Sequence, residues 1–147
     1  MLLETDGAIA SAAAEGVPRD GTTDAQPMLQ ALLDQGRSIY LDPGDYLLRR
    51  GLETRDHHQK IFGPGWGSPG SGNRPTVRLM VYPPGHERGY LDNRRGIITL
   101  DHPHCSVREL EVYFIQRQPT GTPTLAQVEK YAPAIRLRSI GARIEDV

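Results

Sequence analysis

Residues 19–48 decide the fold and read RDGTTDAQPMLQALLDQGRSIYLDPGDYLL. In order, they predict a turn at 20–24, a short amphipathic helix, a strand, a Pro-Gly turn at 42–45 and a second strand. The boundaries between these elements lie where turn residues give way to apolar residues at helical spacing, and where these give way to short apolar runs. The stretch therefore predicts one helix leading into a pair of strands.

The helix has recognisable start and stop signals. Thr23 or Asp24 can accept hydrogen bonds from the free amides of the first turn, and Thr23 and Gln26 stand at capping-box spacing. Gly36 is expected to end the helix in the left-handed conformation. Four residues at helical spacing form one apolar stripe: Met28, Leu29, Leu32 and Leu33.

Strands are expected on both sides of the Pro-Gly turn. Pro43 and Gly44 favour a tight turn, because proline presets φ and glycine allows backbone that other residues avoid. Tyr40 and Tyr46 flank the turn and fit half-buried strand positions.

This order of elements resembles the opening of the pectate-lyase-like superfamily, which includes polysaccharide lyases, glycoside hydrolases and bacteriophage tailspikes. The usual opening is close to GDG-x-x-DD, a helix, and a strand ending in PxG-x-Y; here Arg19 replaces the first glycine and Ala25 the second acidic residue. The motif residues are Asp20, Gly21, Asp24, Pro43, Gly44 and Tyr46. The resemblance implies an all-β fold, a right-handed parallel β-helix with one N-terminal capping helix.

The domain organisation follows from this resemblance. Residues 1–17 are Ala-rich and are expected to be an arm or lead-in, as a short helix, an extended strand or a loose segment. Residues 18–147 are expected to be the start of the β-helix, with further strands at 59–62 and 76–82.

An internal repeat supports a solenoid. Residues 98–110 align without gaps on residues 135–147, at an offset of 37, with apolar residues facing apolar residues. A slip in the apolar alternation near Arg108-Glu109 predicts a corner. The second copy stops in mid-coil, so we expect an open C-terminal end, explained by a longer chain, a covering partner or trimerisation.

Composition excludes several classes of protein. The 17 Lys+Arg and 18 Asp+Glu give a formal net charge of −1, which does not favour nucleic-acid binding. The single Cys105 allows no internal disulfide. No apolar run has membrane-spanning length, and the N-terminus lacks a secretory signal, so we expect no membrane insertion.

Catalytic, cofactor and metal sites are not expected within this chain. The DD pair and GHG turn of polygalacturonase-like members are missing. Asp42 and Asp45 belong to a turn, and Glu109 and Glu111 are expected to point outward along a strand into solvent. Six residues offer metal-ligand chemistry without a recognised spacing: His57, His58, His86, His102, His104 and Cys105.

Trp66, Tyr82 and Tyr90 are the candidate sugar-binding residues, because flat apolar rings with a polar edge suit carbohydrate faces. All three lie in or beside loops, where binding residues concentrate. The alternative is that they pack loops against the strands.

The resemblance, the missing catalytic motifs and the absent signal together favour a virion protein. We expect a structural or receptor-binding component of a phage tail appendage, a tailspike or tail fibre, assembled in the host cytoplasm. Its expected partners are two further copies in a homotrimer, other virion tail proteins and a cell-surface polysaccharide. The alternatives are the N-terminal segment of a polysaccharide lyase or glycoside hydrolase whose active site lies on later coils, and a small sugar-binding module.

Overall fold

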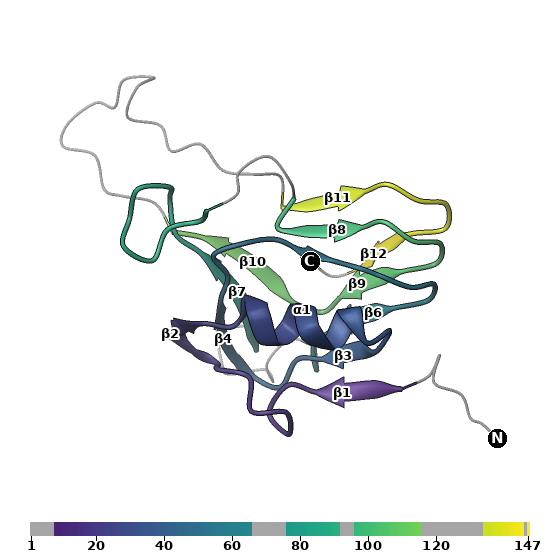
Figure 1. Cartoon of the computed structure of the whole chain (residues 1–147), viewed down its shortest axis with the longest axis horizontal. Coiled ribbons are helices and arrows are strands. Elements are labelled where there is room, and N and C mark those ends of the chain that lie inside the picture. Colours follow the sequence, from purple (N-terminus) through teal and green to yellow (C-terminus); the bar gives the residue numbers. More distant parts are fainter. Residues whose placement is uncertain (1–7, 66–75, 92–95, 116–133, 146) are drawn as a thin grey trace.

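The computed structural model describes residues 8–65, 76–91, 96–115, 134–145 and 147. Within them the chain forms one helix and twelve strands, which lie in three separate parallel sheets (Figure 1). Sheet A contains β1 (Ile9–Ser11), β3 (Ser38–Tyr40), β6 (Lys60–Phe62), β9 (Ser106–Arg108) and β12 (Arg143–Glu145). Sheet B contains β2 (Asp20–Asp24), β4 (Gly44–Leu47), β7 (Val77–Val81) and β10 (Glu111–Phe114). Sheet C contains β5 (Leu52–Glu53), β8 (Ile98–Leu100) and β11 (Ile135–Leu137), and helix α1 (Gln26–Asp34) follows β2.

The chain visits the three sheets in a fixed order. From β3 onward it passes through sheets A, B and C in turn and then returns to sheet A, so neighbours within a sheet come from successive passes. The strand pairs between successive passes are parallel. The expectation of a strand-rich, parallel fold with a single helix is confirmed for the described residues.

The internal repeat corresponds to the pairing of the last two passes. Ile135 pairs with Ile98 in sheet C, and Ile144 pairs with Val107 in sheet A, both at the offset of 37 found by alignment. A one-residue slip would turn every side chain of a strand to the opposite face. The two copies therefore occupy equivalent positions in neighbouring passes.

One corner recurs before the strands of sheet A. Gly36, His58, His104 and Gly141 each lie two residues before such a strand, with φ values of 78°, 61°, 60° and 74°. Glycine reaches this left-handed region without strain, and histidine is one of the few other residues found there often. The predicted corner near Arg108 is also present, because Glu109 has a φ of 58°.

A single apolar core contains side chains from all three sheets and the helix. Ile39, Ile61 and Val107 are fully buried in neighbouring strands of sheet A, in register. Leu29 and Leu33 of α1 are fully buried as the helix packs against β3 and β5. Fully burying such a side chain stabilises the fold by about 1.5–3 kcal/mol.

The start of α1 differs from the prediction. The N-cap position is Ala25, which has no side chain that can cap, while Thr23 lies in β2. Asp24 Oδ1 accepts a hydrogen bond from the Gln26 amide at 3.1 Å. The capping box does not form, because Gln26 Nε2 donates instead to the Gly51 carbonyl. The predicted apolar stripe is also too wide, since Met28 is 40% exposed.

A buried glutamine ties the end of α1 to the next corner. Gln59 is 1% exposed, and its Nε2 donates to the carbonyl oxygens of Leu33 at 2.9 Å and Arg37 at 2.8 Å. Its Oε1 accepts from the backbone amides of Arg55 and Asp56. All of its hydrogen-bonding capacity is therefore used to hold two backbone segments together.

The described part of the N-terminal arm joins the main body. β1 pairs with β3, and Ala10, Ala12 and Val17 are buried in the core. The extended alternative is thus the one observed for residues 9–11.

The last strands of sheets A and C, and the corner that joins them, expose apolar side chains. Leu137, Ile140 and Ile144 are 51%, 83% and 43% exposed. Among the described residues, α1 is too short and too polar to cross a lipid bilayer.

Candidate functional site

The opening motif builds backbone turns. Asp20 Oδ1 accepts hydrogen bonds from the amides of Thr22 at 2.9 Å and Thr23 at 3.2 Å, and these bonds lower the pKa of the Asp20 carboxyl. Gly21 has a φ of 75°, and a Cβ there would lie 3.1 Å from the Met80 sulfur. Asp20 and Gly21 therefore shape an irregular stretch of β2, a strand where the sequence predicted a turn at 20–24.

Asp24, Pro43 and Gly44 connect neighbouring passes. Asp24 Oδ1 accepts the amide of Arg49 at 3.3 Å as well as that of Gln26. The Pro43 carbonyl accepts Arg19 Nη1 at 2.9 Å. A Cβ on Gly44 would lie 2.9 Å from the Arg19 carbonyl oxygen, so only glycine allows this approach.

Tyr46 is fully buried, deeper than the half-buried position predicted. Its hydroxyl donates to the Asp42 carbonyl at 2.6 Å, and burial, together with the nearby Asp42 carboxylate, raises the pKa of Tyr46 to about 12. Burial raises the pKa of Asp42 itself, but hydrogen bonds from the Ala13 amide and the Ser11 hydroxyl outweigh it and lower that pKa overall. Both residues thus hold the turn before β4.

The three sugar-contact candidates do not form one face in the described residues. Trp66 lies outside the described residues. Tyr82 is half-buried and stacks on His86, with ring centroids 4.5 Å apart. Tyr90 is only 4% exposed and lies against Gly51, whose Cβ would be 3.0 Å from the Tyr90 hydroxyl oxygen. This burial favours the packing alternative for Tyr90.

The structure also shows where the acidic and metal-ligand candidates lie. Glu109 lies in the corner between β9 and β10, so the expectation that it alternates with Glu111 along one strand is wrong. Cys105 is buried, and its thiol donates to the Asp56 carbonyl at 3.2 Å. In the parts of the chain that the structure describes, no group of three or more His, Cys, Asp or Glu could hold a metal ion.

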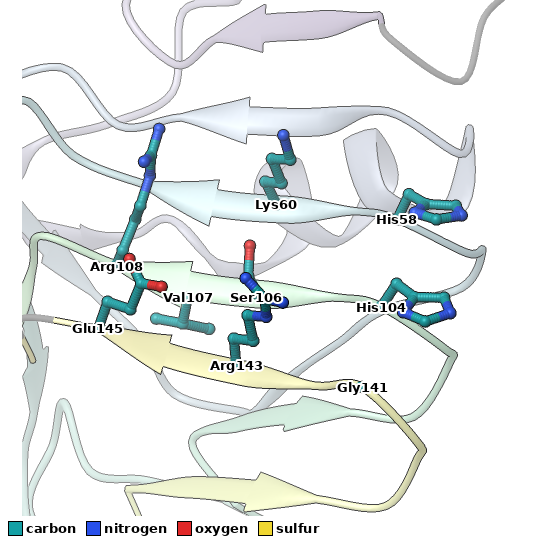
Figure 2. Close-up of a pocket in the computed structure, with 9 residues that line it drawn as sticks. All are labelled: His58, Lys60, His104, Ser106, Val107, Arg108, Gly141, Arg143 and Glu145. Carbon is teal, nitrogen blue, oxygen red and sulfur yellow. The ribbon is translucent and has the colours of Figure 1, made fainter.

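A pocket of about 290 Å³ lies on the outer face of sheet A. Its walls come from β6, β9 and β12 and from the corners that precede them. Figure 2 shows His58 and His104 together at the start of these strands, with Arg108 and Glu145 near their ends. The polar lining residues of the strands are Lys60, Ser106, Arg108, Arg143 and Glu145.

Ring contacts hold the side chains in place at both ends of this pocket. The rings of His58 and His104 stack with centroids 5.0 Å apart and planes 13° apart. A Cβ on Gly141 would lie 2.5 Å from His104 Nδ1, so the His104 ring occupies the space that glycine leaves. At the other end, the Arg108 guanidinium lies 5.3 Å from the centroid of the Phe62 ring.

The pocket was missed because its residues are far apart in the sequence. Residues 58–62, HQKIF, align with 104–108, HCSVR, and with 141–145, GARIE, through the register of sheet A. The repeat at offset 37 contains the second and third of these segments. An alignment extended to the first would have placed Lys60, Ser106 and Arg143 in one row.

Comparisons with protein-family models, with curated proteins and with solved structures found no match to this chain.

Proposed function

We propose that this chain forms the first coils of a right-handed parallel β-helix, capped at the N-terminal end by α1, and serves in a bacteriophage tail appendage as a structural, glycan-contacting component. The observation that carries the proposal is the repeated passage of the chain through the same three parallel sheets. Stacked parallel coils of this kind suit a rigid stalk, because each coil hydrogen-bonds to its neighbours along its length.

The exposed apolar side chains support assembly with further protein. Leu137, Ile140 and Ile144 would lose unfavourable contact with water if another surface covered them. Among the described strands, β11 and β12 lie at the edges of sheets C and A, where a strand of such a partner could pair with them. In our proposal the cover comes from two further copies in a homotrimer and from neighbouring tail proteins.

The outer face of sheet A supports contact with a glycan. Tyr40, Phe62, Arg108 and Glu145 follow one another in register across four strands and point away from the core. Half-buried rings next to polar groups are typical of surfaces that bind sugars.

Native mass tests this proposal. Light scattering on the purified chain, with circular dichroism to show that it is folded, should give three times the chain mass of 16.3 kDa. A folded monomer would contradict the trimeric appendage. It would favour the alternative of an N-terminal segment of a polysaccharide lyase or glycoside hydrolase.

A further inference from the structure

We infer that the pocket on the outer face of sheet A binds the carboxylate of an acidic sugar. The pocket is the space bounded by Lys60, Ser106, Arg108, Arg143 and the His58–His104 stack. The inference rests on the proposed function in one respect, the choice of a saccharide as ligand.

The charges of the lining favour an anion. Lys60, Arg108 and Arg143 contribute three cationic groups, and Glu145 contributes one carboxylate. Three cations and one carboxylate give this pocket an excess of positive charge, although the whole chain has a formal net charge of −1. Arginine and lysine donate charge-assisted hydrogen bonds to carboxylates, which are about twice as strong as neutral ones.

Several of the donors are held in place before a ligand arrives. Arg108 lies over the Phe62 ring, and the stacked histidines fix the opposite end. The central donors, Lys60, Ser106 and Arg143, follow one another in register on adjacent strands. Adjacent strands in a sheet are about 4.8 Å apart, a spacing that allows the oxygens of one carboxylate to reach donors on two strands. Such preorganisation reduces the entropy lost on binding.

The neighbouring aromatic row favours a sugar acid over a free inorganic anion. Phe62 and Tyr40 continue the Arg108 row away from the pocket, and their rings lie 5.4 Å apart. Phe62 lies between Tyr40 and Arg108 in this row, so the Tyr40 ring is the surface that can meet the C–H face of a pyranose, and it offers nothing to sulfate or phosphate. A volume of about 290 Å³ lies at the small end of ligand pockets and suits one sugar residue.

Titration with sodium glucuronate, followed by NMR of the His58 and His104 rings, tests the inference. We expect saturable shifts with a Kd on the order of 1 mM, as for a shallow site with few contacts. Glucose, which has the same ring without the carboxylate, should cause no shifts, and sodium sulfate should bind at least about fivefold more weakly than glucuronate.

Matched arginine variants separate the pocket from general charge. Arg143→Gln should weaken glucuronate binding about tenfold, the value of one hydrogen bond to a charged group. Arg136→Gln removes an equally exposed arginine on β11 of sheet C, outside the pocket, and should leave the Kd unchanged.

Four results would overturn the inference: no shifts with glucuronate, equal effects of the two variants, equal binding of glucose, or sulfate binding as tight as glucuronate. The outcome is independent of the native mass. A monomer that binds glucuronate through Arg143 contradicts the trimeric appendage alone, whereas a trimer that ignores glucuronate contradicts the acidic-sugar site alone.

Discussion

Replacing Gln59 by methionine should cost far more stability than the same replacement at an exposed glutamine. The Gln59 amide makes four hydrogen bonds to backbone groups and is 1% exposed. Each such bond contributes about 1 kcal/mol, so their loss costs about 4 kcal/mol. Methionine has a similar volume and recovers about 1 kcal/mol by burying additional apolar atoms. The expected decrease in the free energy of unfolding is therefore about 3 kcal/mol.

Urea unfolding followed by circular dichroism at pH 7 measures this difference. Domains of this size are stable by about 5–15 kcal/mol, so the variant should remain folded with a much lower midpoint. Gln35→Met is the matched control, because Gln35 is an exposed residue just beyond the end of α1. It should change stability by less than about 0.5 kcal/mol.

Gln59→Glu adds a test of the donor role. The introduced carboxylate would face the carbonyl oxygens of Leu33 and Arg37, which now accept from Nε2. Burial and these acceptors should raise the pKa of the new carboxyl in the folded state. The variant should therefore lose least stability at acid pH and more as the pH rises through that pKa. A loss below about 1 kcal/mol for Gln59→Met, or a pH-independent loss for Gln59→Glu, would refute the reasoning.

Two further predictions concern the corners. Gly141→Ala should lower the free energy of unfolding by about 2–3 kcal/mol and Gly16→Ala by about 1–2 kcal/mol. Both residues have positive φ, but only at Gly141 would the added Cβ meet a neighbour, the His104 ring. Urea unfolding of each variant, alone and combined with His104→Ala, measures these losses. Without the His104 ring, the two glycine substitutions should cost the same. Asp42→Asn should lower stability at pH 7 by about 1 kcal/mol. Because the pKa of Asp42 is lowered in the folded state, its contribution is present at neutral pH and lost as the pH falls, so melting temperatures of wild type and variant should converge in acid. Melting curves that stay parallel would contradict this.

Much of the fold could be predicted because its signals are local. The Pro43-Gly44 turn, the left-handed Gly36 and the alternation of buried residues in β7 are each set by neighbouring residues. The repeat at offset 37 also predicts the register of β11 and β12, since corners of equal length place apolar residues at equivalent positions.

The helix start and the depth of the tyrosines were not predictable in the same way. Gln26 has capping-box spacing to Thr23, yet its amide reaches Gly51 on the next pass. Tyr90 lies beside a loop in the sequence, but the core closes over it. Both outcomes depend on residues brought close only by tertiary packing.

The candidate pocket was invisible for a related reason. Lys60, Ser106 and Arg143 are separated by 46 and 37 residues, as the register of sheet A shows. The passes differ in length, so no single period relates the three residues. Only the register of the strands reveals them as neighbours.

The corners between sheets C and A have a consequence for how such a chain can change. These connections, residues 54–59, 101–105 and 138–142, are short and nearly equal in length, while those from sheet B to sheet C differ widely, as at 48–51 and 115–134. The short corners carry the left-handed residues that set the register, so one inserted residue there would exchange inner and outer faces of the next strand. The B-to-C connections tolerate large differences in length, as these two examples show. Evolution or protein engineering can therefore insert new loops between sheets B and C while the strands of sheet A stay in register.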